Sequence, residues 1–401
     1  MTESDYDEII LGQGLAGSTL AWSLRWRGRN VLVIDRDLAG TSSRIAAGLM
    51  TPITGQRLVK SWRWDQFWAA ATAFYRRVES ETETGFFHPQ KSVRLLADES
   101  ERAFLDRRLA SEFAGLMTQP QPLVNSDWFD DRLGGFEMSE GGRLNVAAFL
   151  DASRQRLERD GQFVAADLDI ESDIELTPSG VRLPRFGVVA RRLVFCEGIG
   201  ATGNPWFQHV RFKPAKGEIL TVRIEGLPEE RIVSRGVWLM PLGNNLFRAG
   251  ATYEWRDLDS TPTSQGRDEI CSRLREFLRL PFEVIGHDAA VRPILRHQFP
   301  VVGFHPEHRQ LGFFNGLGSK GALQAPWLAD HLAGLLTGES PLDPAVDLHH
   351  YERHPPPSIS SRATPTRSVS EGASQQTPSV SRGIPNEPRD NSSGLSGGVP
   401  T

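Results

Sequence analysis

Three glycines near the N-terminus have the spacing G-x-G-x-x-G, at Gly12, Gly14 and Gly17. In such a turn the first glycine permits a tight bend and the second lets the backbone approach a pyrophosphate. The third lets a helix pack closely on the preceding strand, with Ala16 inside the same turn. The motif predicts a dinucleotide-binding site.

The segments around these glycines must form a strand, a helix and a second strand. Short apolar runs at Ile9–Leu11 and Val31–Ile34 are typical of buried parallel strands, and Leu15–Arg27 has helical periodicity. The positive end of that helix would face the phosphates. Asp35 ends the second strand, where its carboxylate would accept hydrogen bonds from an adenosine ribose, with Arg36 beside it.

FAD and NAD both use this motif, so the rest of the chain must distinguish them. Directly after the second strand, hydroxyl and small residues would let the backbone approach a flat ring closely. The residues that we assign to this approach are Ser42, Ser43, Ala47 and Gly48.

Two later segments also contain glycine-rich turns after strands. Arg191–Ala201 is suited to a second pass beside the nucleotide, with Gly198 in its turn. Leu311–Leu336 has the pattern of a strand, a turn and a helix whose N-terminus would stabilise the anionic reduced ring of a flavin. The cofactor-binding residues predicted in this segment are Gly316, Gly318, Ser319 and Gly321. A second segment of this kind has no role in an NAD-dependent dehydrogenase, which favours FAD.

Composition excludes several other classes of protein. The chain has 401 residues and a net charge of −5, without a basic stripe, so we do not expect nucleic acid as a partner. Cys196 and Cys271 are too few for a disulfide framework or zinc cluster, and the histidines lack ligand spacing, so we predict no metal. No apolar run could span a bilayer, and the acidic N-terminus lacks a secretory signal, which predicts a cytoplasmic protein.

The alternation of strand-like and helix-like segments predicts an α/β fold, with one domain built from separated pieces and a second domain inserted between them. Residues 354–401 contain no aromatic residue and are rich in Ser, Pro and Gly, so we predict a disordered tail.

Ordered motifs across Tyr6–Arg353 resemble the D-amino-acid oxidase-like superfamily of FAD-dependent oxidoreductases and are most similar to its glycine oxidase branch. These motifs are GQGLAGS, SSRIAAGLMTP, GGRLNVAAFL, LVFCEGIG, KGEIL, VWLMP, AGATYEW, VRPI, PVVG and NGLGSKGALQAP. The resemblance implies a Rossmann-like FAD-binding domain in discontinuous segments and a substrate domain with an antiparallel sheet over the flavin. We predict the FAD-binding domain at residues 1–85, 139–209 and 288–353, and the α+β substrate domain at 86–138 and 210–287.

The resemblance also implies a reaction and a substrate pocket. Family members of this type oxidise a small amine or amino acid by hydride transfer to flavin N5, giving an imine, and oxygen or another acceptor reoxidises the flavin. Arg292 falls where glycine oxidase-like members bind the substrate carboxylate, and an arginine suits that role because its planar fork can bind a carboxylate bidentately. Trp238 and Tyr253 would supply pocket walls, although Trp238 stands where the glycine oxidase pattern has tyrosine, which puts glycine in doubt as the substrate.

Lys320 precedes the predicted helix that faces the flavin, where a cation would favour negative charge on the reduced ring or on reacting oxygen. The attachment cysteine of sarcosine oxidase relatives has no match, so we predict non-covalent FAD. Three alternatives remain open. They are a flavin domain acting on a carboxymethylaminomethyl-modified tRNA uridine, an NAD-dependent dehydrogenase, and a non-catalytic flavin-binding protein. The substrate, the electron acceptor and the oligomeric state are not defined by the sequence.

Overall fold

The computed structural model describes residues 4–109, 113 and 115–351. The predicted disordered tail, 354–401, lies outside these described residues. Two eight-stranded sheets, one with a parallel core and one mostly antiparallel, form the framework of the described chain. The fold is therefore mixed α/β, as the alternation of segments predicts.

The first sheet has the order β11-β2-β1-β14-β13-β12, with β21 paired to β14 and β20 paired to β21. Its core pairs β1–β2, β1–β14, β2–β11 and β14–β21 are parallel, whereas β12, β13 and β20 pair antiparallel. The strands are β1 Ser4–Leu11, β2 Val31–Asp35, β11 Phe163–Ala165, β12 Glu175–Thr177, β13 Gly180–Leu183, β14 Val188–Phe195, β20 Val301–Phe304 and β21 Leu311–Asn315.

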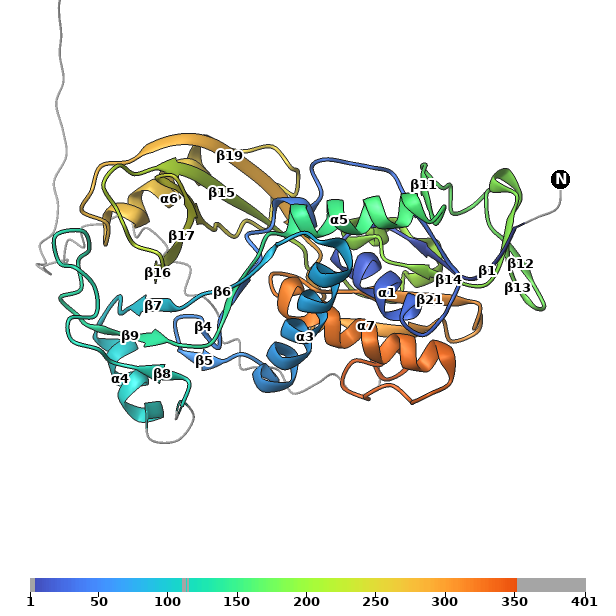
Figure 1. Ribbon diagram of the computed structural model, residues 1–401, viewed down its shortest axis with the longest axis horizontal. Coiled ribbons are helices and arrows are strands. Elements are labelled where there is room, and N and C mark those ends of the chain that lie inside the picture. Colours follow the sequence, from blue (N-terminus) through green and yellow to red (C-terminus); the bar gives the residue numbers. More distant parts are fainter. Residues whose placement is uncertain (1–3, 110–112, 114, 352–401) are drawn as a thin grey trace, which may run out of the picture. The chain divides into compact units, whose positions relative to one another are not determined.

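Both faces of this sheet are buried, which explains the continuous apolar runs in its strands. In β1, Ile10 faces one core cluster, whereas Ile9 and Leu11 face another. The first cluster lies between the sheet and four helices. Those helices are α1 Leu15–Arg25, α3 Trp64–Thr82, α5 Val146–Arg159 and α7 Gly321–Thr337, and in Figure 1 the last three lie around α1.

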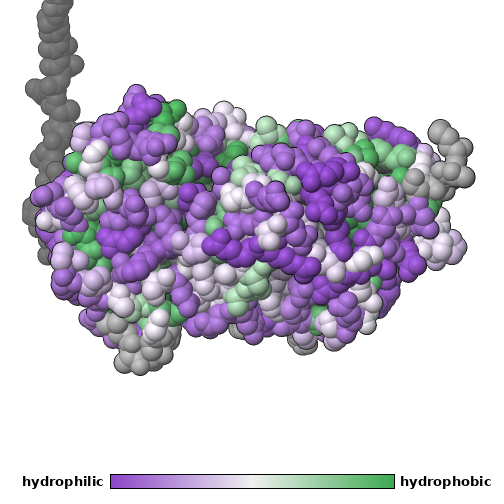
Figure 2. All heavy atoms as spheres, in the orientation of Figure 1, coloured by the Kyte–Doolittle hydropathy of each residue, from purple (hydrophilic) through white to green (hydrophobic). Residues whose placement is uncertain are grey.

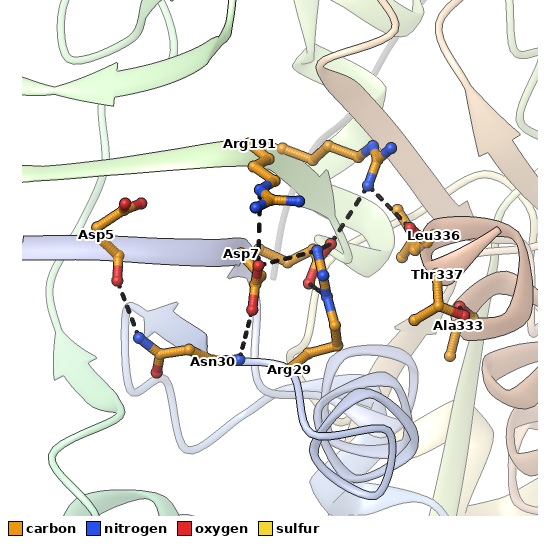
Figure 3. A network of polar contacts seen from close by, with 10 residues as sticks. Asp5, Asp7, Arg29, Asn30, Arg191, Ala333, Leu336 and Thr337 are labelled. Carbon is orange, nitrogen blue, oxygen red and sulfur yellow. Dashed lines mark hydrogen bonds and ion pairs between the residues drawn. The ribbon is translucent and has the colours of Figure 1, made fainter.

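Polar contacts tie the beginning of β1 to the C-terminal end of α7 (Figure 3). Glu8 is fully buried, and its carboxylate accepts a hydrogen bond of 2.8 Å from Arg29 and one of 3.4 Å from Arg192. Arg192 also donates to the carbonyl of Leu336 at 3.0 Å. The network lies at the N-terminal ends of the parallel strands, so it holds the helix without occupying the opposite edge, where ligands bind in such sheets.

The second sheet has the order β19-β15-β18-β17-β16-β7-β9-β8, and β16–β7 is its parallel pair. Helix α6, Ser264–Arg275, packs against it through Ile270 and Leu274. In Figure 1, β15, β17, β19 and α6 lie together on the left. The strands are β7 Ser92–Leu95, β8 Met117–Thr118, β9 Gly135–Met138, β15 Ala215–Arg223, β16 Ile232–Arg235, β17 Val237–Gly243, β18 Leu246–Gly250 and β19 Glu283–Arg292.

Shorter elements connect the two sheets. The order β3-β10-β6 forms a three-stranded sheet and β4-β5 a two-stranded one. The bounds are β3 Leu49–Met50, β4 Ile53–Thr54, β5 Val59–Lys60, β6 Phe87–Pro89, β10 Gly142–Leu144, α2 Ser42–Ile45 and α4 Glu99–Leu109. Short 3-10 helices lie at Pro184–Phe186, Gly198–Gly203, Pro205–Phe207 and Leu348–His350.

The two sheets agree with the predicted α/β fold, but the domain boundaries themselves stay a prediction. Strand β19 runs across the predicted boundary between residues 287 and 288.

Among the described residues, none of the helices is long and apolar enough to cross a membrane. On the face shown in Figure 2, hydrophilic residues predominate and hydrophobic ones form small separate patches. The cytoplasmic location stays a prediction.

Candidate active site

A cavity of about 1130 Å³ lies between the C-terminal ends of the parallel strands and one face of the antiparallel sheet. Typical pockets for drug-sized ligands have roughly 300–1,000 Å³. The cavity can therefore hold a dinucleotide together with a small substrate. Most of the predicted site residues line it: Gly12, Gly14, Ala16, Asp35, Arg36, Ser42, Ser43, Ala47, Gly48, Gly198, Trp238, Tyr253, Arg292, Gly318, Ser319, Lys320 and Gly321.

The turn between β1 and α1 has no room for side chains at its glycines. Gly12 has φ of +105°, and a Cβ there would lie 2.5 Å from the carbonyl oxygen of Cys196. A Cβ at Gly17 would lie 1.8 Å from the carbonyl oxygen of Gly12, so this glycine lets the helix pack on the turn and does not line the cavity. Gly14 caps α1, whose first turn contains no acidic residue. The helix N-terminus is thus suited to phosphate oxygens.

Asp35 is held at the cavity edge by hydrogen bonds from two backbone groups. Its Oδ2 accepts from the N–H of Gln13 at 2.6 Å, and its Oδ1 accepts from the N–H of Asp37 at 2.7 Å. Arg154, on α5, lies 3.7 Å from Asp35 and 2.7 Å from Asp37, and also donates to the side chain of Gln13 at 2.9 Å. A carboxylate has lone pairs beyond these contacts, so Asp35 can still accept from a ribose hydroxyl. The exposed Arg36 lines the cavity next to it.

Helix α2 places its hydroxyl residues against the start of α1. The N–H of Leu15 donates to Ser43 Oγ at 3.2 Å, and a Cβ on Gly14 would lie 2.9 Å from the same oxygen. Gly48 follows with φ of +67°, and a Cβ there would lie 2.0 Å from the carbonyl oxygen of Leu144. The small residues therefore bring three backbone segments together along one wall of the cavity.

The turn after β21 connects two other walls of the cavity. Asn315 donates to the carbonyl of Gly198 at 2.9 Å and accepts from the N–H of Gly316 at 2.8 Å. Gly316 does not line the cavity, because it directly follows β21 with φ of +85° and packs against Leu295. Helix α7 begins at Gly321, not at Gly316, and its first turn faces the cavity together with that of α1.

Lys320 is the N-cap residue of α7 and is partly buried at the cavity wall. Its ammonium group lies 3.4 Å from Thr54 Oγ1 and 3.3 Å from Ser61 Oγ. Burial lowers the pKa of Lys320, because removing water disfavours the charged form. No carboxylate offsets this effect among the described residues, and an anionic group in the cavity would favour the charged form of Lys320.

Arg292 ends β19, where its guanidinium lies against the backbone of β15 and under the ring of Tyr253. It donates to the carbonyls of Thr252 at 3.1 Å and of Lys216 at 3.4 Å, and it lies 4.2 Å from the centroid of the Tyr253 ring. Within the described part of the chain it has no carboxylate partner, and burial lowers its pKa. A charged arginine without an acid in a cavity is suited to bind the carboxylate of a ligand.

The antiparallel sheet supplies the opposite wall of the cavity. Gly250, Trp238, Ser234 and Arg94 are successive neighbours in one row across β18, β17, β16 and β7, and all four line the cavity. A Cβ on Gly250 would lie 3.0 Å from the Trp238 ring, so the glycine makes room for the indole. Trp238 is partly buried, whereas Tyr253 is 45% exposed.

Three residues that the sequence reasoning did not single out shape this site. Gly217 leaves the space that the Arg292 guanidinium occupies, and Arg154 fixes the Asp35 loop. Glu197 lines the cavity, and burial raises its pKa despite a hydrogen bond from Asn204. The motif KGEIL contains Gly217, and LVFCEGIG contains Glu197, but neither motif by itself indicates which contact its residue makes.

In residues 4–109, 113 and 115–351, no group of three or more His, Cys, Asp or Glu side chains could hold a metal ion. The residues present fit a flavin dinucleotide instead. Two glycine-lined helix N-termini face one cavity, and an acid stands at the end of β2.

Fold and site together define a dinucleotide-dependent oxidoreductase of the flavoprotein class. Residues 7–335 match the DAO family, FAD dependent oxidoreductase. The chain belongs to this family, whose cofactor is FAD and whose members include amino-acid oxidases.

Curated relatives are similar over most of the described chain. The tRNA 5-methylaminomethyl-2-thiouridine biosynthesis bifunctional protein MnmC of Marinobacter nauticus is 27% identical over 366 residues, which cover 81% of this chain and 54% of that protein. The chain thus spans about half the length of this relative. The glycine oxidase of Bacillus licheniformis is 24% identical over 366 residues, covering 83% of this chain and 93% of that enzyme.

Among solved structures, the glycine oxidase from Bacillus cereus ATCC 14579 superposes with a TM-score of 0.72. It is 18% identical, and the match covers 84% of this chain and 98% of that one. At this identity the similarity shows the fold, which is that of the amino-acid oxidases.

Proposed function

We propose that the chain oxidises a small amine that carries a carboxylate, either an amino acid or an N-substituted glycine. The observation that carries this proposal is Arg292, a cation inside the cavity whose described partners are two backbone carbonyls and an aromatic ring. A ligand carboxylate would replace the water that this guanidinium has lost. The similarity to glycine oxidases supports the same substrate class.

Non-covalently bound FAD would supply the hydride acceptor for oxidation of a small amine to an imine, with oxygen or another acceptor as the final oxidant. The chain's own residues would orient the substrate and enclose it. Arg292 would hold the carboxylate, Trp238 and Tyr253 would form walls of the space around it, and the N-terminus of α1 would hold the phosphates. The reaction needs no side-chain base when the amine arrives neutral.

Purified protein should be yellow and should lose its visible flavin absorption anaerobically when the right amine is added. A panel that pairs each amino acid with its decarboxylated amine tests the role of Arg292. In Arg292→Ala the preference for the carboxylated member should fall about tenfold or more. Arg223→Ala, on the same β15–β19 sheet region but outside the cavity, should leave the preference unchanged.

Two results would contradict the proposal. One is a protein that takes up no FAD. The other is an Arg292→Ala variant that loses activity equally toward both members of each pair.

A second candidate is a flavin-dependent step on a carboxymethylaminomethyl-modified tRNA uridine, favoured by the similarity to MnmC proteins. The segment Gly318-Ser319-Lys320-Gly321 at the start of α7 also resembles that enzyme. This substrate contains a glycine-like group that Arg292 would bind in the same way. Binding of tRNA whose affinity falls steeply with salt concentration would support this candidate, and binding that does not depend on salt would oppose it.

A further inference from the structure

Two exposed aromatic rings, Tyr253 and Trp255, lie side by side at the rim of the cavity. Tyr253 and Trp255 are stacked, with ring centroids 6.0 Å apart and planes inclined by 28°. They are 45% and 49% exposed. Tyr253 lines the cavity, whereas Trp255 lies just beyond the lining residues.

Tyr253 and Trp255 stand out among the described aromatic side chains because they are largely exposed. Six large apolar side chains are exposed among the described residues, and the aromatic ones are Tyr253 and Trp255. Both rings lie in a segment that the backbone holds firmly. The N–H of Lys216 donates to the carbonyl of Glu254 at 2.8 Å, the N–H of Glu254 donates back to Lys216 at 3.0 Å, and the N–H of Trp255 donates to Glu254 Oε1 at 2.7 Å.

One ring of the aromatic pair, Tyr253, contacts Arg292, the residue predicted to bind the carboxylate. Arg292 lies 4.2 Å from the centroid of the Tyr253 ring, and Tyr253 stacks on Trp255. A ligand whose carboxylate binds Arg292 would therefore leave the cavity across these two rings. Flat aromatic groups gain stacking energy on such a surface beyond the apolar area that they bury.

We propose that Tyr253 and Trp255 form a subsite for a planar aromatic substituent on a carboxylated amine, with the reacting end inside the cavity and the aromatic end stacked on Trp255. This inference rests on the proposed function and specifies its substrate class. Trp255 acts as a specificity-determining residue that touches the substrate far from the reacting carbon.

Binding of unreactive acids to the FAD-loaded protein tests the subsite without turnover. The probes are phenoxyacetate and its saturated analogue cyclohexyloxyacetate, with methoxyacetate as the small reference acid, and the readout is the shift in flavin absorption. We expect phenoxyacetate to bind about three- to tenfold more tightly than cyclohexyloxyacetate. Trp255→Leu should remove this preference and leave methoxyacetate affinity unchanged, whereas Trp255→Phe should retain most of it.

Leu242→Ala changes a similarly exposed apolar residue outside the cavity lining and should preserve the preference. Equal affinities for the two larger acids in the unchanged protein, or an unchanged preference in Trp255→Leu, would overturn the inference. A change of oligomeric state in Trp255→Leu would assign the rings to contact with a second copy of the chain instead.

These titrations, together with the anaerobic amine panel, separate this inference from the proposed function. If small amino acids reduce the flavin but the aromatic preference is missing, only the subsite is wrong. If no carboxylate binds and no amine reduces the flavin, the proposed function fails and the subsite with it.

Discussion

A Cβ atom at position 217 would lie 1.9 Å from Nη2 of Arg292, so the arginine occupies space that only glycine leaves free. The two residues belong to neighbouring antiparallel strands, β15 and β19, in which Ala215 pairs with Arg292. The glycine therefore decides where the cation lies, although it has no polar side chain of its own.

Gly217→Ala should displace the guanidinium and weaken binding of carboxylated ligands about tenfold or more, while FAD content stays normal. Equilibrium titration of the FAD-loaded variant with methoxyacetate measures the loss. Gly85→Ala is the matched control, because a Cβ at that exposed position meets nothing within 4 Å. Undiminished affinity in Gly217→Ala would mean that Arg292 does not bind the carboxylate.

Gly17→Ala should lower the stability of the fold, whereas Gly14→Ala should weaken FAD binding. The new Cβ at 17 meets backbone, the carbonyl oxygen of Gly12 at 1.8 Å, so we expect a loss of stability of about 1–3 kcal/mol. The Cβ at 14 meets the side chain of Ser43 at 2.9 Å, which can rotate, so the fold should persist while FAD binding weakens. Thermal unfolding without FAD, followed by FAD titration, separates the two effects. Similar melting temperatures for the two variants would contradict this reasoning.

Lys320→Met should make the bound flavin harder to reduce, because the cation at the start of α7 would no longer stabilise the anionic reduced ring. We expect the midpoint potential to fall by about 30 mV, equivalent to about 1.4 kcal/mol for a two-electron couple. Lys320→Arg should keep most of the potential. Lys213→Met, an exposed lysine outside the cavity lining, should not change it. A potential that is the same in all four proteins would exclude Lys320 as a charge partner of the flavin.

Asp259 should contribute pH-dependent stability through the buried Lys216. The two groups are 2.6 Å apart, Lys216 is 2% exposed, and the hydrogen bond from Lys216 lowers the pKa of Asp259 below its ordinary 3.8. Because the carboxyl binds its proton less readily in the folded chain, the stabilisation is complete above pH 3.8 and is lost as pH falls through the lowered pKa.

Asp259→Asn should therefore melt at a lower temperature than the unchanged protein at neutral pH, and the difference should shrink in acid. Melting curves from pH 7 downwards measure it. Asp257→Asn, on the same loop, should show no such difference. A gap between Asp259→Asn and the unchanged protein that widens in acid would reverse the assigned sign.

Local patterns predicted the elements that carry the cofactor site. The glycine fingerprint and the strands at Ile9–Leu11 and Val31–Ile34 are signals within a few adjacent residues, and each is present in the structure. The helix predicted at Leu15–Arg27 ends at Arg25, because Arg27 and Gly28 already form the turn that leads into β2.

Contacts between segments far apart in the sequence could not be predicted from local patterns. Gly217 and Arg292 meet through strand pairing across 75 positions, and no local pattern specifies which glycine must accommodate which side chain. Similarly, the glycine pattern does not indicate that Gly316 packs against Leu295 directly after β21, or that the helix begins five residues later, at Gly321. The motif AGATYEW contains Tyr253 and Trp255, but the motif does not indicate that both rings are exposed next to the cavity.

The buried Glu8 network has a consequence for the far end of α7. A helix rises 1.5 Å per residue, so Leu336, whose carbonyl accepts from Arg192, lies about 24 Å along the axis from Lys320. Because a packed helix moves as a rod, a shift at the Arg192 anchor would be transmitted to the cavity. The alignment of Lys320 is thus set partly by an acid at the opposite edge of the sheet, where a substitution could alter the cofactor environment without touching it.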